Sequence, residues 1–172
     1  MKQVLVDMDG VLADVYTQFQ NYEKEEYGKV RPLEELIGKL ELEAFPHGDK
    51  YVRSKGFFQT APIIPDSIEG LKYLNDKYKV LIVSSATEFP DSLREKLSWL
   101  NTHFPFISWK QMIFCGEKNS IKGDIMIDDH PKNLDFFDGQ KILFTQPHNM
   151  LLDVPEYIRV GSWREIMDST YL

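Results

Sequence analysis

Five short apolar runs constrain most strongly how this chain can fold. They are residues 4–6, KVLIVSS at 79–85, QMIFC at 111–115, DIMIDD at 124–129 and KILFT at 141–145. Strands that are apolar without alternation are buried on both faces, as in a parallel sheet. Helical spacing of apolar residues fills 65–78 and 90–104, and in the latter Leu93, Leu97 and Leu100 are expected to face the core. This order predicts an α/β fold, a Rossmann-like parallel sheet flanked by helices.

A polar, helix-rich segment interrupts this alternation directly after the first strand. Residues 14–62 lack strand signals and contain three helical stretches: 15–28 ending at Gly28, 32–40 starting at Pro32, and 49–55. We therefore predict a small helical cap at 14–62, inserted into an α/β core made of residues 1–13 and 63–172.

Charge and composition limit the kinds of partner and the cellular compartment that suit this chain. The chain has 27 Asp and Glu against 20 Lys and Arg, so nothing basic is concentrated enough to bind a nucleic-acid polymer or an anionic membrane. The single cysteine, Cys115, rules out a disulfide framework and fits a reducing compartment. With no signal peptide and no run long enough to cross a bilayer, the sequence predicts a cytoplasmic protein. The oligomeric state is not determined, and a homodimer is compatible with the sequence.

Polar residues follow four successive apolar runs. They are Asp7 and Asp9, then Ser84 and Ser85, then Lys118, then Asp128 and Asp129. In an open parallel sheet, ligands bind beyond the carboxyl ends of the strands. These side chains are therefore expected to meet at one edge of the sheet.

The chemistry of this set points to a cation and a phosphate. Carboxylates packed together need a compensating cation or a proton-transfer role, and an all-oxygen set suits Mg²⁺. A serine hydroxyl and a lysine ammonium suit phosphate oxygens. The four histidines are scattered and lack zinc-ligand spacing. Taken singly, Ser84 and Ser85 also fit a helix N-cap, Lys118 a surface lysine, and Asp129 the start of a helix.

The chain resembles the haloacid dehalogenase superfamily of aspartate-dependent phosphatases. VDMDGV with Asp7 and Asp9, LIVSS with Ser84, then Lys118, and MIDD with Asp128 match its four motifs in order. More narrowly, DMDGVLAD, SKGFFQTAPIIP, IDDHPKN and SWREIMDS are similar to the 5'(3')-deoxyribonucleotidases, and this similarity spans nearly the whole chain. Two positions depart from the pattern: Gly116 stands where the relatives carry Arg, and Ser84 where they often carry Thr.

The resemblance implies a role for each residue of the set. Asp7 would be the nucleophile that forms an aspartyl-phosphate, and Asp9 the general acid and base. Asp7, Asp128 and the backbone carbonyl of Asp9 would hold Mg²⁺. The phosphate would be bound by Ser84, Ser85 and Lys118, and Asp129 would orient its neighbours without binding the metal.

The predicted substrate is a small phosphomonoester, and the resemblance implies a deoxyribonucleoside monophosphate. Aromatic residues of the cap are the candidates for contact with a flat base: Phe19, Phe45, Phe57 and Phe58. Two alternatives stay open. One is a phosphatase of a sugar phosphate or another small phosphomonoester on the same core. The other is a signalling receiver domain that accepts a phosphoryl group without turning it over, although receivers carry no helical insertion after the first strand and lack a base for the water such as Asp9.

Overall fold

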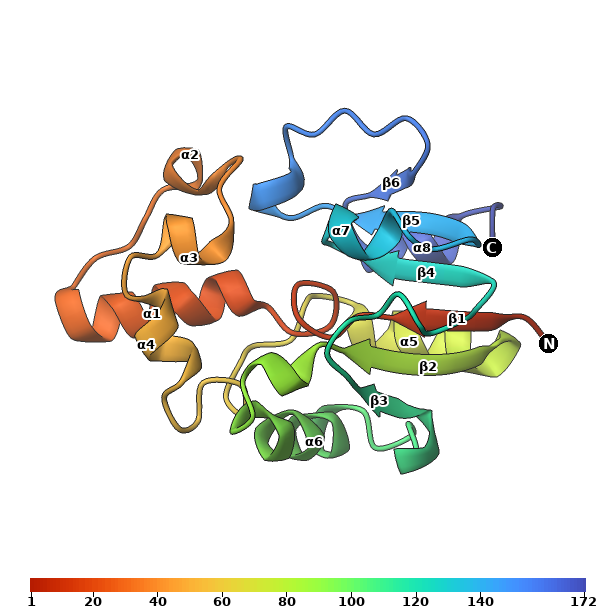
Figure 1. Ribbon diagram of the computed structural model, residues 1–172, viewed down its shortest axis with the longest axis horizontal. Coiled ribbons are helices and arrows are strands. Elements are labelled where there is room, and N and C mark those ends of the chain that lie inside the picture. Colours follow the sequence, from red (N-terminus) through yellow and green to blue (C-terminus); the bar gives the residue numbers. More distant parts are fainter.

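The computed structural model describes residues 1–172 and contains a six-stranded sheet in which all neighbouring strands run parallel (Figure 1). In sheet order the strands are β3 (Met112–Phe114), β2 (Lys79–Ser84), β1 (Gln3–Val6), β4 (Ile125–Asp128), β5 (Gln140–Phe144) and β6 (Ile158–Val160). The predicted parallel α/β fold is confirmed. The sequence did not indicate β6, because this edge strand has only three residues and exposes Arg159 at its centre.

Helices cover both faces of the sheet. In β1, one of its two central strands, every residue except Gln3 is buried. Val4 and Val6 face a cluster of 23 buried residues that includes side chains of α5 (Ser67–Lys77), α6 (Ser92–His103) and α8 (Trp163–Asp168). Leu5 faces the opposite side, where it shares a cluster with Leu134 of α7 (Pro131–Leu134). Burial on both faces explains why β1 reads as a continuous apolar run.

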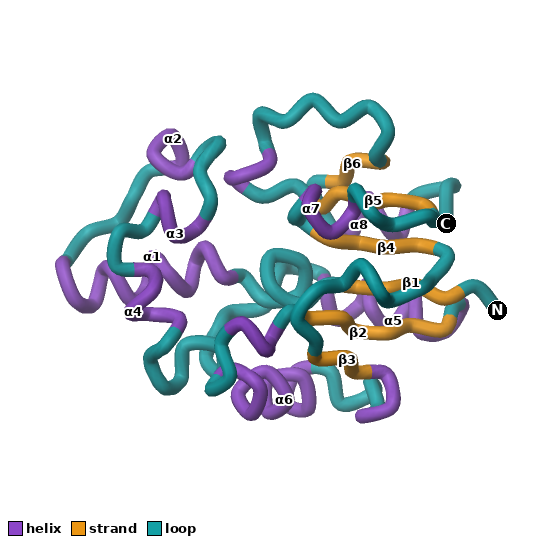
Figure 2. The backbone as a smooth tube through the Cα atoms, in the orientation of Figure 1, coloured by secondary structure: helices purple, strands orange, loops and turns teal.

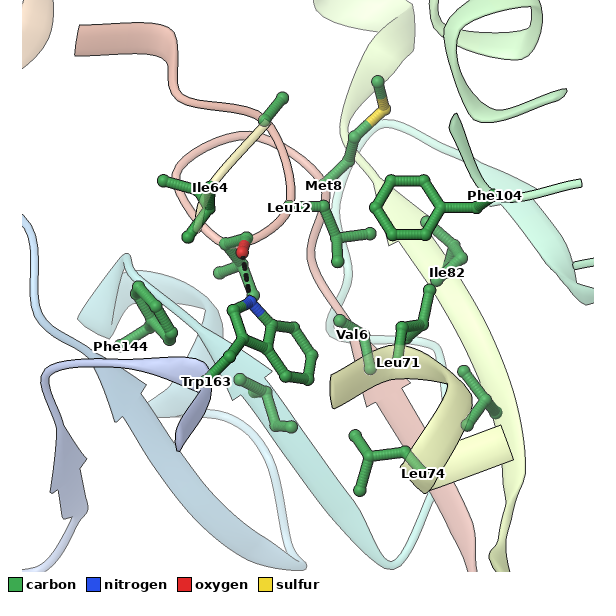
Figure 3. Close-up of a cluster of buried hydrophobic side chains, with 14 of the residues drawn as sticks. Val6, Met8, Leu12, Ile64, Leu71, Leu74, Ile82, Phe104, Phe144 and Trp163 are labelled. Carbon is green, nitrogen blue, oxygen red and sulfur yellow. Dashed lines mark hydrogen bonds between the residues drawn. The ribbon is translucent and has the colours of Figure 1, made fainter. Parts of the chain in front are cut away.

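Trp163 of α8 braces the loop that follows β1 (Figure 3). Its indole is fully buried, and its Nε1–H donates a hydrogen bond to the Val11 carbonyl at 2.8 Å. The close approach of α8 to α5 requires a glycine, since a Cβ at Gly70 would lie 2.2 Å from Cε3 of Trp163. The carboxyl end of the chain thus supports the segment that carries Asp7 and Asp9.

The buried face of α6 differs from the predicted one. The helix buries Ser92, Lys96, Trp99 and Leu100, whereas Leu97 remains 39% exposed. Hydrogen-bond partners allow these polar groups to be buried. The Trp99 Nε1–H donates to the Ala61 carbonyl at 2.7 Å, and the Lys96 ammonium contacts Asp9 and Ser84. The expectation that Leu97 faces the core was wrong.

Of the five helices between β1 and β2, the first four gather beyond the carboxyl ends of the strands (Figures 1 and 2). They are α1 (Val15–Tyr27), α2 (Leu33–Leu36), α3 (Glu41–Ala44) and α4 (Gly48–Val52). The Asp14 carboxylate caps α1 by accepting a hydrogen bond from the Thr17 N–H at 2.9 Å. Gly28 ends this helix in the left-handed conformation, with φ of 67°.

These helices share a core of their own. Ten buried hydrophobic residues, all between Val15 and Phe58, form a cluster separate from the two that flank the sheet. The two ends of the segment also meet, because the Asp14 N–H donates to the Pro62 carbonyl at 2.8 Å. The division of the chain at residues 14–62 stays a prediction, and these residues are called the cap below.

Three 3-10 turns complete the chain: η1 (Ala86–Glu88), η2 (Trp109–Gln111) and η3 (Pro147–Asn149). None of the helices combines the length and the hydropathy that crossing a bilayer requires.

Candidate active site

A cavity of about 340 Å³ lies between the carboxyl end of β1 and the cap. This volume falls within the roughly 300–1,000 Å³ typical of small-molecule sites. Its core side is charged and includes Asp7, Asp9, Lys96, Lys118 and Asp129. Its cap side includes the apolar residues Val15, Phe19, Leu40, Leu42, Val52, Phe57 and Phe58. One end of a ligand would therefore meet the charges of the core, and the other a mostly apolar surface that also carries Glu41 and Glu43.

Lys118 joins two carboxylates from neighbouring strands. Its ammonium lies 2.6 Å from Asp7 Oδ1 and 2.7 Å from Asp128 Oδ2. Asp7 follows β1 and Asp128 ends β4, and these two strands pair directly in the sheet. All three side chains are buried, so the attraction between them is only weakly screened by solvent. The three residues share one small volume, as the sequence analysis required.

One lysine does not compensate for two buried carboxylates. Burial and the charge of Asp128 raise the pKa of Asp7 to about 6, although Lys118 acts in the opposite direction. Burial alone would lower the pKa of Lys118, but Asp128 and Asp7 together raise it above its ordinary value. The site therefore retains an excess of negative charge that a further cation would offset.

Asp129 adds a third buried carboxylate beside this pair. Burial raises its pKa well above the ordinary value, and its Oδ1 has no hydrogen-bond partner. The loop after β1 makes room for it, because a Cβ at Gly10 would lie 2.0 Å from Asp129 Oδ2. Gly10 also has φ of 75°, which favours glycine at this position.

The carboxylates of Asp7, Asp128 and Asp129 form a set that fits a hard divalent cation. One oxygen from each lies within 4.8 Å of the others. An all-oxygen set with several negative charges is the environment that Mg²⁺ prefers. The Asp129 carboxylate belongs to this set, whereas only an orienting role was predicted for it from the sequence.

Lys96 binds the second aspartate of the motif, a role that was not predicted from the sequence. Its ammonium lies 2.5 Å from Asp9 Oδ2 and 3.0 Å from Ser84 Oγ. The lysine itself is 2% exposed and also lies over the Phe58 ring, 4.5 Å from the centroid. Its position in an amphipathic helix gave no signal, because Lys96 is a polar residue on the face that the helix buries.

The two serines after β2 occupy different positions. Ser85 lines the cavity, while Ser84 is 1% exposed and accepts its hydrogen bond from Lys96. Gly116 leaves its position open, since a Cβ there would meet only Thr87 Oγ1, at 3.5 Å. No arginine lines the cavity; the lysines that line it are Lys96, Lys118 and Lys132.

The aromatic residues of the cap divide into two groups. Phe19, Phe57 and Phe58 line the cavity, together with Phe89, which follows η1 and was not predicted. Phe45 does not line it. Its ring is fully buried and stacks on Phe19 at 4.9 Å between centroids, so it packs in the cap core.

Comparison with known proteins relates this chain to one family over nearly its whole length. The family model described as 5' nucleotidase, deoxy (pyrimidine), cytosolic type C protein (NT5C) matches residues 1–171. A 5'(3')-deoxyribonucleotidase of Bacillus subtilis is 39% identical over 170 residues, covering 96% of this chain and 97% of the relative. A 5'(3')-deoxyribonucleotidase of Bacillus phage SPbeta has the same identity and coverage.

Two solved structures share the fold at low sequence identity. An L-2-haloacid dehalogenase superposes with a TM-score of 0.60 at 10% identity, covering 97% of this chain and 98% of the other. A haloacid dehalogenase-like family hydrolase from Streptococcus pneumoniae gives a TM-score of 0.55 at 15% identity, with 97% of each chain covered.

Proposed function

Because the chain belongs to the family of cytosolic type C deoxy-pyrimidine 5' nucleotidases, we propose that it hydrolyses deoxyribonucleoside monophosphates in a Mg²⁺-dependent reaction. The observation that carries this proposal is the convergence of Asp7, Lys118 and Asp128 beside the cavity. Lys118 contacts both carboxylates, at 2.6 and 2.7 Å. A nucleophile, a cation for phosphate oxygens and a metal ligand are thus within reach of one phosphoryl group.

Asp7 is the nucleophile in this proposal. The Met8 N–H and the Lys118 ammonium both approach its Oδ1, at 2.7 and 2.6 Å, which leaves Oδ2 to attack phosphorus. The Asp7–phosphorus bond forms as the bond from phosphorus to the sugar oxygen breaks, giving an aspartyl-phosphate. This intermediate divides one difficult displacement into two easier steps.

Asp9 moves the protons in both steps. It gives a proton to the departing sugar oxygen and then takes one from the water that attacks the aspartyl-phosphate, which frees Asp7. Its side chain is 31% exposed, whereas that of Asp7 is 8% exposed, so water can reach Asp9 more easily. Lys96 holds the Asp9 carboxylate in place through its contact with Oδ2.

The metal and the phosphate have separate partners. Asp7, Asp128 and the backbone carbonyl of Asp9 would hold Mg²⁺, with the Asp129 carboxylate adjacent. When bound, Mg²⁺ supplies positive charge that offsets the carboxylates and the phosphate oxygens. Lys118 and Ser85, which both line the cavity, would bind phosphate oxygens, whereas the Ser84 hydroxyl is buried beside Lys96.

The cap side of the cavity would receive the nucleoside. Phe19, Phe57, Phe58 and Phe89 offer ring faces or edges there, and aromatic faces pack well against a flat base. The cavity walls alone do not distinguish one base from another. Substrate choice between deoxyribonucleotides and sugar phosphates is therefore the point that an experiment has to decide.

The test is phosphate release from a panel of deoxyribonucleoside 5'- and 3'-monophosphates and sugar phosphates, with and without Mg²⁺. We expect the deoxyribonucleotides to give the highest kcat/KM, release to require Mg²⁺, and Asp7→Asn to abolish it. Preference for a sugar phosphate would replace the substrate but keep the mechanism. A phosphorylated protein that never releases phosphate would indicate a receiver and contradict the proposal.

A further inference from the structure

A glutamate of α6 holds the turn of the cap that carries Phe57 and Phe58. Glu95 Oε1 accepts a hydrogen bond from the Gly56 N–H at 2.5 Å, and Glu95 Oε2 accepts one from the Phe58 N–H at 3.1 Å. Neither N–H has a backbone acceptor. Hydrogen bonds to a carboxylate are shorter and stronger than those between neutral groups. Glu95 is therefore the group that satisfies both amides and ties the turn to the core.

The turn, residues 56–60, is also fixed from inside the cap. The N–H and the hydroxyl of Thr60 both donate to the Gly56 carbonyl, at 3.0 and 2.9 Å, which closes the turn. Gln18 of α1, which is 2% exposed, donates from Nε2 to the Phe57 carbonyl at 2.7 Å. The turn thus has a defined shape of its own, and Glu95 determines where this shape lies relative to the core.

We propose that Glu95 is a positioning residue for the nucleoside part of the substrate. It sets the position of Phe57 and Phe58, and through them the affinity for the nucleoside, without acting on the chemistry at phosphorus. Both phenylalanines line the cavity, whereas Glu95 does not, so its effect on a ligand has to pass through the turn. The inference rests on the proposed function, because that function assigns a nucleoside to the cap side of the cavity.

The two rings that the turn carries belong to a connected aromatic wall. The Phe58 ring lies 6.3 Å from the Phe89 ring between centroids, and the Lys96 ammonium lies 4.5 Å from the Phe58 centroid. Phe57 packs edge-on against Phe58 at 5.0 Å and also contacts Phe19, at 4.9 Å. Because these rings pack on one another, a shift of the turn would change the whole surface offered to a flat base.

Glu95 and Lys96 are adjacent in α6 but serve opposite ends of the ligand. Lys96 contacts Asp9 and Ser84, beside the position of the phosphoryl group. Glu95 contacts only the turn that would face the nucleoside. Removing the Lys96 ammonium should therefore slow the chemical steps, whereas removing the Glu95 carboxylate should weaken the binding of the nucleotide.

The test compares the binding of thymidine 5'-monophosphate with that of inorganic phosphate, in saturating Mg²⁺. Asp7→Asn serves as the parent protein, so that the nucleotide is not hydrolysed. Adding Glu95→Ala should weaken thymidine monophosphate binding about 5- to 20-fold, because part of the stacking contribution of the rings is lost, and should leave phosphate binding unchanged. Glu95→Gln keeps one acceptor oxygen and should give an intermediate loss. Glu69→Ala, exposed on α5, is the matched control and should bind both probes as the parent does.

Amide hydrogen exchange, measured by NMR, tests the hydrogen bonds of Glu95 without any ligand. The Gly56 and Phe58 amides should exchange about tenfold faster or more in Glu95→Ala, because both lose their acceptor. In Glu69→Ala their exchange rates should stay those of the parent.

Three results would overturn the inference and leave the proposed function intact. They are unchanged exchange of both amides in Glu95→Ala, unchanged nucleotide binding in the same variant, and an equal loss of affinity for nucleotide and phosphate, which would indicate a general structural role. A parent protein that binds phosphate but no thymidine monophosphate would overturn the proposed function and, with it, the role assigned to Glu95.

Discussion

Replacing Lys96 with methionine tests whether a buried cation positions the proposed general acid. Lys96→Met keeps an unbranched side chain of similar length but removes the ammonium that lies 2.5 Å from Asp9 Oδ2 and 3.0 Å from Ser84 Oγ. The contact of the stem with the Phe58 ring can persist. The variant should therefore release the Asp9 carboxylate without opening a large cavity.

The expected loss follows from what remains in place. Asp9 itself is retained, so the loss should be smaller than the roughly 10²–10⁴-fold contribution of a general acid or base. A displacement of about 1 Å in a catalytic geometry can cost about 10²-fold. We expect kcat to fall about 10- to 100-fold, which corresponds to about 1.4–2.7 kcal/mol of activation free energy. KM should change less, because Lys118, the proposed phosphate ligand, is retained.

The assay is steady-state kinetics of phosphate release from a deoxyribonucleoside monophosphate in saturating Mg²⁺. Arg94→Met, on the exposed side of the same helix, is the control and should behave as the wild type. If Lys96 acts through Asp9, the double variant Lys96→Met/Asp9→Asn should be no slower than Asp9→Asn alone, since the two residues act as a unit. A wild-type kcat for Lys96→Met, or fully multiplicative losses in the double variant, would refute this reasoning.

Three further predictions use other parts of the site. Gly10→Ala should lower the free energy of unfolding, measured in urea, by about 1–3 kcal/mol, because its backbone is in the left-handed region and the new Cβ would lie 2.0 Å from a carboxylate oxygen. Gly28→Ala should lose less stability, because a Cβ there would have no atom within 4 Å. Phe89→Leu should raise KM for a deoxyribonucleotide about 3- to 10-fold, because a base stacked on an aromatic ring contributes about 1–3 kcal/mol and leucine keeps part of the contact. The control Phe45→Leu should lower the melting temperature and leave KM unchanged. Burial and a neighbouring carboxylate raise the folded-state pKa of Asp7 to about 6. In EDTA, the protonated Asp7 side chain therefore favours folding fully below its ordinary pKa of 3.8, and this contribution is lost as the pH rises through 6. This loss is on the order of 3 kcal/mol of the free energy of unfolding, and Asp7→Asn should remove it. Urea titrations of both proteins at several pH values measure the difference.

Much of the fold could be predicted because its central strands are buried on both faces. Continuous apolar runs marked β1, β2, β4 and β5, and the alternation with helices indicated that they are parallel. Parallel strands place their carboxyl ends at one edge of the sheet. For this reason, the sequence alone could anticipate that Asp7, Lys118 and Asp128 would meet.

The features that the sequence did not show depend on tertiary contacts. Lys96 is a charged residue that is buried only because Asp9 and Ser84 provide partners, so helical spacing placed its neighbouring leucines inward instead. Phe45 could not be distinguished from the cap aromatic residues that line the cavity, because all of them belong to the same buried cluster. Glu41 and His148 meet across the boundary between cap and core, which no local pattern marks.

The central claim is that Asp7 carries the phosphoryl group between substrate and water. The most direct test uses Asp9→Asn with p-nitrophenyl phosphate, whose leaving group needs no protonation while the second step still lacks its base. We predict a burst of one equivalent of p-nitrophenolate, with phosphate found on Asp7 by mass spectrometry of the acid-quenched protein. Turnover without a burst and with no phosphate on Asp7, or a burst that persists in Asp7→Asn, would contradict the mechanism.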